Sequence, residues 1–225
     1  MGLDMYLNKM PRYKKATAND VYAIECYLDL KNYQAKGEYK DCTLREWCAI
    51  DESELPAQDV IDYYSKFYET KYSSWDTEMK YPHDNIIEEV GYWRKANHIH
   101  NWFVEHVQDG VDDCRYHREV TKETIEKLLD TCIKVYESCT MIVGAVNNGE
   151  SYINGEWVQN IEAGKVVIDP SVAEELLPTC GGFFFGGTDY DEYYVEQVRE
   201  TIEMLNVILD TTNFDKEMIY YVSSW

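Results

Sequence analysis

The sequence predicts an α+β fold, in which helices pack on a small, mostly antiparallel sheet with an added β-meander. Long segments repeat apolar side chains at the helical period, whereas shorter segments alternate apolar and polar residues between turn signals. Of the 225 residues 45% are hydrophobic, and 20 Tyr and 6 Trp are among them, so the chain can bury a substantial core. One or two compact domains fit this length, and we expect a single domain over residues 1–225.

The first half of the chain begins with a short predicted strand, Leu3 to Leu7, followed by Val21 to Leu30, which fits either a strand or a helix. A helix is expected to begin near Pro56, because proline is favoured in the first helical turn and apolar residues follow at helical spacing. The Tyr- and Ser-rich stretch 72–85 is predicted to be a loop. Apolar residues at helical spacing then predict a long helix over Gly91 to Val107.

The second half opens with a predicted helix over Thr121 to Cys139 and continues as a region of short strands. Asn154-Gly155 is the strongest hairpin signal in the chain, and the segments around it predict a small meander. Its strands are expected at 141–146, 151–153, 156–159 and 165–168. The remaining predicted elements are a buried strand at Phe183 to Phe185, a helix at Thr188 to Leu209 and a strand at Met218 to Val222.

Charge restricts the partners of this protein. The 21 Lys and Arg residues and 42 Asp and Glu residues give a formal net charge of −21. Such a field repels DNA, RNA and anionic membranes, and it attracts basic protein surfaces. The imbalance is greatest in residues 161–225, which contain 3 basic and 13 acidic side chains. We therefore expect a basic protein partner and no direct binding to nucleic acid or a membrane.

The cysteines and the opening residues indicate a soluble intracellular protein. Seven cysteines form an odd set without a CxxC pair, which favours reduced thiols over a disulfide framework. The opening residues lack the basic and apolar regions of a signal peptide, and no apolar run is long enough to cross a membrane. We expect a cytosolic location.

The predicted helix over Thr188 to Leu209 presents a row of carboxylates. Carboxylates one turn apart repel one another, so an unbroken row weakens the helix that contains it. Apolar side chains at helical spacing occupy the opposite face, which places the carboxylates on the surface. Two interpretations remain open: a docking surface for a basic partner, or a charged face that keeps the protein soluble. The row consists of Asp189, Glu192, Glu196, Glu200 and Glu203.

Basic and polar residues cluster in the predicted helix over Gly91 to Val107. Arginine and lysine bind anions, and histidine titrates near neutral pH, so this cluster is a candidate ligand site or acid–base group. The alternative is that the polar side chains hold neighbouring loops and that a basic group pairs with an internal carboxylate. The candidates are Arg94, Lys95, Asn97 and His100.

The phrase GGFFFGG, followed by TDYDEYY, predicts another wall of the same pocket. A nucleotide base could stack on Phe184, with Asp191 at the rim, although the phrase is neither GxGxxG nor a P-loop. The alternative is that the glycines bend a buried strand. Thr188 or Asp189 would then cap the following helix, with Glu192 as a capping-box partner.

We predict no metal site, no cofactor and no catalytic residue. The aspartates at 112 and 113 lie near Cys114 and His117, but the spacing fits neither a zinc finger nor an EF-hand. Capping of a turn by the two aspartates is the simpler interpretation. Cys114, with His117 or His100 as a partner, is the one thiol to consider as a nucleophile, and free cysteine is more often an inert small hydrophobe.

Several long phrases resemble an uncharacterised family of bacteriophage and prophage proteins. They are MGLDMYL at the start, YWRKANHIHNWFV at 92–104, VQDGVDDC at 107–114, LLPTCGGFFFGGTDYDEYY at 176–194 and YYVSSW at 220–225. The resemblance implies a phage origin and a location in the host cytoplasm, but no established activity. Residues 31–85 and 141–169 have no counterpart in the resemblance, and we interpret them as insertions into a shorter common core.

Two functions follow from these features. In the first, a non-enzymatic phage protein acts in host takeover or anti-defence by placing its acidic helix on a basic host surface, where carboxylates roughly 5–6 Å apart imitate nucleic-acid phosphates. In the second, a pocket between Arg94, His100 and Phe183 to Phe185 binds a nucleotide-like molecule, as a binding protein or an enzyme. We favour the first, because the charge is a property of the sequence whereas the pocket is inferred.

Overall fold

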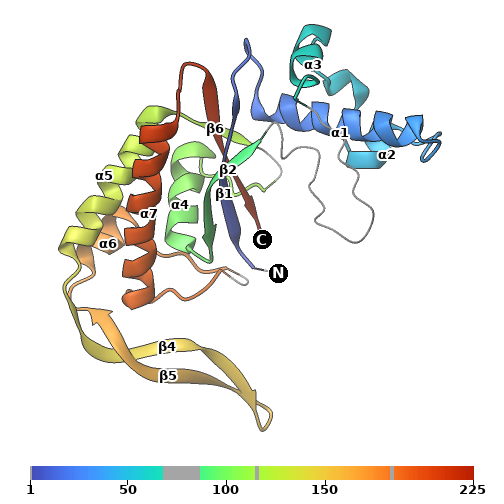
Figure 1. Ribbon diagram of the computed structural model, residues 1–225. Helices are drawn as coiled ribbons and strands as arrows, with labels where there is room; N and C mark the ends of the chain where they lie inside the picture. Colours follow the sequence, from blue (N-terminus) through green and yellow to red (C-terminus); the bar gives the residue numbers. More distant parts are fainter. Residues whose placement is uncertain (1, 68–86, 115–116, 183–184) are drawn as a thin grey trace.

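The computed structural model describes residues 2–67, 87–114, 117–182 and 185–225, and it has the predicted α+β class (Figure 1). A four-stranded antiparallel sheet in the order β2-β1-β6-β3 lies at its centre. Its strands are β1 (Asp4–Pro11), β2 (Glu88–Arg94), β3 (Arg118–Val120) and β6 (Glu217–Ser224). The strands predicted at Leu3 to Leu7 and at Met218 to Val222 are thus confirmed as β1 and β6, and the two pair with each other.

The alternation of side chains along β1 divides the interior into two cores. Leu3, Met5 and Leu7 point to one face of the sheet and are completely buried there, together with Ile219 of β6. Met10 points to the other face, where a smaller core forms. Because successive side chains on a strand point to opposite faces, one strand serves both cores.

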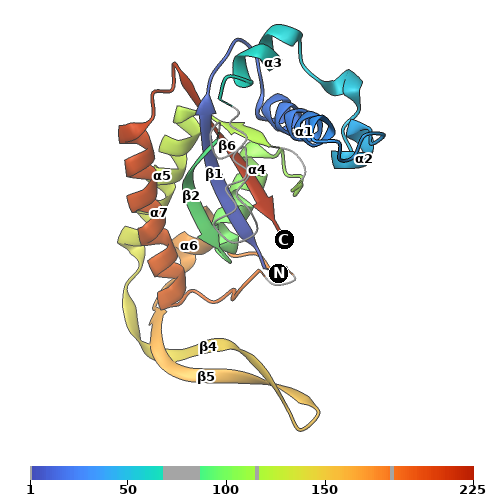
Figure 2. The ribbon, with the colours of Figure 1, turned by 45° about the vertical axis from the view of Figure 1, so that its right-hand side comes forward.

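Helices on one side of the sheet form the larger core (Figures 1 and 2). They are α4 (Asn97–Val107), α5 (Lys122–Ser138), α6 (Ser171–Leu176) and α7 (Glu192–Thr211). The helix predicted at Thr121 to Cys139 is confirmed as α5, with Thr121 as its N-cap. The predicted acidic helix is also present, but it begins at Glu192 because the carboxylate of Asp191 accepts hydrogen bonds from the backbone N–H groups of Tyr193 and Tyr194.

A second group of helices packs near one end of the opposite sheet face (Figure 2). It comprises α1 (Ala18–Ala35), α2 (Leu44–Cys48), the 3₁₀ turn η1 (Glu52–Glu54) and α3 (Gln58–Tyr64). Val21 to Leu30, which fits either a strand or a helix, is part of α1; Thr17 and Asp20 form a capping box that starts this helix. The helix predicted near Pro56 corresponds to α3, whereas the loop predicted at 72–85 lies outside the described residues.

The helix predicted over Gly91 to Val107 is wrong in its first part, which is strand β2. Its apolar spacing continues by coincidence across a turn at Lys95, whose φ is +60°. Gly91 pairs with Leu7 of β1, and a Cβ at this glycine would lie 2.7 Å from Met204 Sδ and 3.3 Å from Leu7 Cβ. The missing side chain therefore lets α7 pack closely on the sheet, and the helix α4 begins only at Asn97.

Residues 141–167 form a single long hairpin in place of the predicted meander. Its two strands, β4 (Met141–Ile153) and β5 (Glu156–Val167), pair with each other and project from the body (Figures 1 and 2). The predicted turn at Asn154-Gly155 is confirmed, and both of its residues have positive φ, as a two-residue hairpin turn requires. Of the strand predicted at 183–185, only Phe185 is described, and it lies in the loop before α7.

Replacing Thr201 by valine should destabilise the attachment of α7 to the sheet. Trp93 Nε1 donates a buried hydrogen bond of 2.8 Å to Thr201 Oγ1. Valine keeps the shape but leaves the indole N–H without its acceptor, so we expect the free energy of unfolding to fall by about 1–3 kcal/mol in chemical denaturation. Thr211→Val is the control: this exposed threonine also bonds to the carbonyl four residues earlier, and we expect a change within about 0.5 kcal/mol. Equal losses in the two variants would contradict the anchoring role.

Candidate functional site

The acidic row on α7 lies on the surface, but it is not unbroken. Glu196, Glu200 and Glu203 are exposed, whereas Glu192 is only partly exposed and Asp189 lies in the preceding loop. The Arg199 guanidinium lies between two of the exposed glutamates: its Nε donates to Glu196 Oε2 at 3.0 Å, and its Nη1 bonds to Glu203. This pairing offsets the repulsion expected within the row, and it leaves three exposed carboxylates against one cation on this face.

The β4–β5 arm exposes apolar side chains far from either core. Val143 is 82% exposed, and Trp157 near the tip is 68% exposed. Trp157 pairs across the strands with Tyr152, and the two ring centroids lie 5.2 Å apart. Isolated two-stranded hairpins have little stability of their own, and exposed apolar patches commonly mark interaction surfaces. The exposed apolar side chains of the arm are those of Ile142, Val143, Tyr152, Ile153, Trp157, Val158 and Ile161.

The base of this arm is attached to the start of α7. Val166 of β5 forms an antiparallel bridge with Asp191, and the Val167 N–H donates to the Tyr190 carbonyl at 3.0 Å. A Cβ added at Gly164 would lie 2.7 Å from Glu192 Oε1, so the first turn of the helix also touches the arm. The acidic helix and the apolar arm therefore meet at one junction.

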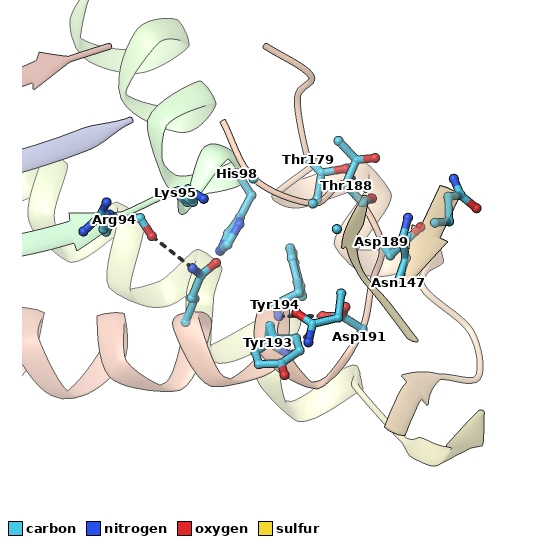
Figure 3. A pocket seen from close by; sticks show the side chains of 16 residues that line it. Arg94, Lys95, His98, Asn147, Thr179, Thr188, Asp189, Asp191, Tyr193 and Tyr194 are labelled. Atoms are coloured by element: carbon cyan, nitrogen blue, oxygen red, sulfur yellow. Dashed lines mark hydrogen bonds between the residues drawn. The ribbon is translucent and has the colours of Figure 1, made fainter. Parts of the chain in front are cut away.

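An open cleft of about 730 Å³ lies beside this junction (Figure 3). It is bounded by the end of β2, the first turn of α4, the loop before α7 and the middle of the arm, where the pairing of β4 with β5 is irregular. Gly186 in that loop has φ +97°, and a Cβ there would lie 3.0 Å from the Lys95 carbonyl oxygen. The side chains at the cleft include Arg94, Lys95, His98, Asn147, Thr179, Thr188, Asp189, Asp191, Tyr193 and Gln197.

Three of the predicted ligand-binding residues line the cleft. The turn after β2 places Arg94 and Lys95 along it, and both are exposed. Within the described part of the chain, the one ion pair of the Arg94 side chain is long, with its Nε 4.0 Å from Asp4 Oδ1. Asp191 lies across the cleft from these cations, where it caps α7, and burial raises the pKa of its carboxyl group (Figure 3).

Asn97 is buried and holds the loop before α7. Its Nδ2 donates to the Gly187 carbonyl at 2.7 Å and to the Phe185 carbonyl at 3.2 Å. Its Oδ1 accepts a 3.0 Å hydrogen bond from the Cys180 N–H. Both N–H donors of the carboxamide are used and the residue is 1% exposed, so the loop-holding interpretation applies to this residue. The predicted ligand contact at Phe184 lies outside the described residues.

His100 does not line the cleft and lies on another side of α4. It is 1% exposed, and its Nδ1 lies 2.7 Å from Tyr221 Oη. Its Nε2 is 3.2 Å from Asp112 Oδ2, without the alignment of a hydrogen bond. Trp225 Nε1 donates to the other oxygen of the same carboxylate at 3.1 Å. The predicted pocket between Arg94 and His100 is therefore corrected: His100 connects α4 with β6 and the end of the chain.

His98 is the cleft residue that the sequence did not indicate. It is 2% exposed, its ring centroid lies 4.4 Å from that of Tyr194, and its Nε2 has no hydrogen-bond partner among the residues that the structure describes. Burial lowers the pKa of this histidine to about 3, so the ring is neutral at physiological pH. His98 and His100 are two residues apart on α4, so the position of the turn at Lys95 determines which of them faces the cleft. The apolar periodicity of the sequence continues through this turn and does not reveal it.

The phrases that carry the family resemblance meet around this region. Lys95 N–H donates to the Leu3 carbonyl at 2.8 Å, which joins the phrase at 92–104 to the first one. Asn97 binds the phrase at 176–194, and His100 contacts those at 107–114 and 220–225. Segments far apart in the chain are thus brought to one place.

The remaining sequence candidates are the metal-type residues and the cysteines. Among the described residues, no group of three or more His, Cys, Asp or Glu side chains could hold a metal ion. Cys114 is exposed, while the ring of His117 stacks on Tyr220. All seven cysteines are free, and in the described part of the chain every helix is too short or too polar to cross a bilayer.

Comparison with known proteins gives no match to any family model, any curated protein or any solved structure. The class that the fold itself defines is an α+β protein with a projecting hairpin arm and a polar cleft. Function therefore has to be inferred from these surfaces.

Protonation of His98 should make stability depend on pH. Its pKa is about 3 in the folded protein and about 6.5 in an unfolded chain, so between these values only the unfolded state binds the proton. Stability is fully present above pH 6.5 and falls as the pH decreases, by up to about 1.4 kcal/mol per pH unit from this residue. Denaturation midpoints of the wild type and His98→Gln from pH 7 to pH 5 should show a flatter profile for the variant. Parallel profiles would contradict the buried, neutral state of the ring.

Proposed function

We propose that the protein is a non-enzymatic, phage-encoded accessory protein that binds a basic surface of a host protein in the host cytoplasm. The observation that supports this function best is the junction of the apolar arm with the acidic face of α7. Binding surfaces combine a few large apolar anchors with charged groups around them. The phage and host parts of the proposal rest on the sequence resemblance.

The arm supplies the anchors in this proposal. Trp157 and Tyr152 are exposed near its tip, and tryptophan and tyrosine are among the residues that contribute most to binding energy. Apart from the bridge at Val166, both long edges of the hairpin leave backbone groups unpaired by any further strand in the described residues. A partner can therefore contact the arm through side chains and through strand addition.

In this proposal the acidic helix orients the basic partner and increases the rate of its association. Its exposed glutamates sit about one turn apart, similar to successive phosphates along a nucleic-acid strand, so a nucleic-acid-binding host protein is the preferred partner class. Arg199 neutralises one of these charges locally, and the net charge of −21 still attracts a basic surface over long range. The same charge disfavours direct nucleic-acid binding.

Charge reversal on α7 tests this function. In Glu196→Lys/Glu200→Lys/Glu203→Lys, the charge of the exposed face of α7 is reversed, and we expect capture of the host partner from bacterial lysate to fall at least tenfold. Tyr152→Thr/Trp157→Thr should give a similar loss, because the anchors are removed while strand-favouring residues remain. Quantitative mass spectrometry of the captured proteins, at low and high salt, measures both effects.

A matched reversal separates the local surface from the total charge. Glu38→Lys/Asp41→Lys/Glu52→Lys changes three exposed acidic residues around α1 and η1, and it shifts the net charge by the same amount. Capture should persist in this control. The proposal fails if the folded α7 variant retains its partner, or if the control loses it equally.

A further inference from the structure

The cleft beside the arm contains two buried polar atoms without partners. His98 Nε2 and Asn147 Oδ1 are both inaccessible to solvent and make no hydrogen bond to any described residue, and both residues line the cleft. The histidine belongs to α4 and the asparagine to β4, so the two walls of the cleft contribute one atom each. Buried polar groups are normally paired, and two unpaired ones at one cleft indicate a ligand with hydrogen-bonding groups.

The charges in the cleft are separated by side. Figure 3 shows Arg94 and Lys95 at one side and Asp189 and Asp191 at the other. Within the described residues Lys95 has no ion pair, and the guanidinium of Arg94 has only the 4.0 Å contact with Asp4. A single anionic group fits beside the two cations, whereas a longer polyanion would reach the carboxylates opposite.

The rest of the lining suits a neutral, hydroxylated and planar ligand portion. Asn147, Asn148, Gln159 and Gln197 present carboxamides, which both donate and accept hydrogen bonds as sugar hydroxyls do. Tyr193, which also lines the cleft, is 56% exposed and offers an aromatic ring for stacking. The volume of about 730 Å³ is in the range of small-molecule sites.

We propose that this cleft binds a nucleoside monophosphate, with the phosphate beside Arg94 and Lys95 and the base against Tyr193. Because the unpaired His98 and Asn147 atoms are inaccessible in the free protein, the sugar and base edges reach them through a small shift of the cleft walls on binding. This site is independent of the protein-binding function, although both adjoin the arm. Nucleoside triphosphates bind more weakly, because their additional charges face Asp189 and Asp191.

Isothermal titration calorimetry with the full chain tests the site. AMP, GMP, CMP and UMP are titrated separately, with ribose 5-phosphate, inorganic phosphate and ATP as comparison ligands. We expect at least one monophosphate to bind at least tenfold more tightly than ribose 5-phosphate, inorganic phosphate and ATP. Arg94→Ala and Tyr193→Ala, both at exposed side chains, should each weaken that binding at least tenfold.

Two matched controls and one buried variant complete the experiment. Arg45→Ala on α2 and Tyr136→Ala on α5 remove an exposed arginine and an exposed tyrosine elsewhere, and both should bind as the wild type does. His98→Phe fills the same space without ring nitrogens and should weaken binding. The proposal is overturned if no monophosphate binds at millimolar concentration, if ribose 5-phosphate or phosphate binds equally well, or if the two exposed cleft variants bind normally. Loss of binding in Tyr136→Ala would also overturn it.

Discussion

The strand β1 is hydrogen-bonded along both edges and packed on both faces, and the positions of the other elements depend on this double constraint. Leu3, Met5 and Leu7 hold the larger helical layer, while Met10 meets the helices of the opposite face. A slip of one residue would exchange the two sets of side chains and expose both cores. The edge of the cleft follows from the same pairing, because β2 ends at Arg94, opposite Asp4.

Asp191 shows how the arm, the cleft and the acidic helix are mechanically connected. Its side chain caps α7, its backbone forms the bridge to Val166 of the arm, and the residue also lines the cleft. An N-cap of this kind contributes about 0.5–2 kcal/mol to a helix. Movement of the arm and occupation of the cleft therefore act on the same helical turn.

Sequence patterns predicted correctly the elements that are determined by residues within one segment. They failed for elements whose structure depends on pairing with residues far away in the chain. The helix at Thr121 to Cys139 has its own N-cap and one apolar face, and Asn154-Gly155 specifies its turn alone. Gly91 to Val107 was assigned wrongly, because the strand at its start exists only through pairing with β1. The same error placed His100 at the pocket instead of His98. The meander was also assigned wrongly, because the local sequence does not show how its strands pair. In the structure β4 and β5 pair with each other along nearly the whole arm.

The pairing of β1 with β6 also governs the order in which this chain can fold. The strand β6, at residues 217–224, is the second neighbour of β1 in the sheet. This edge of β1 can therefore pair only after residues 217–224 have left the ribosome. Contacts between such distant segments require closure of a very long loop and slow the search for the native state. During synthesis the apolar side chains of β1 have no completed sheet to enter. The pairing of β1 with β6 is therefore a late step in the assembly of the sheet, and the apolar side chains of β1 stay open to other contacts until then.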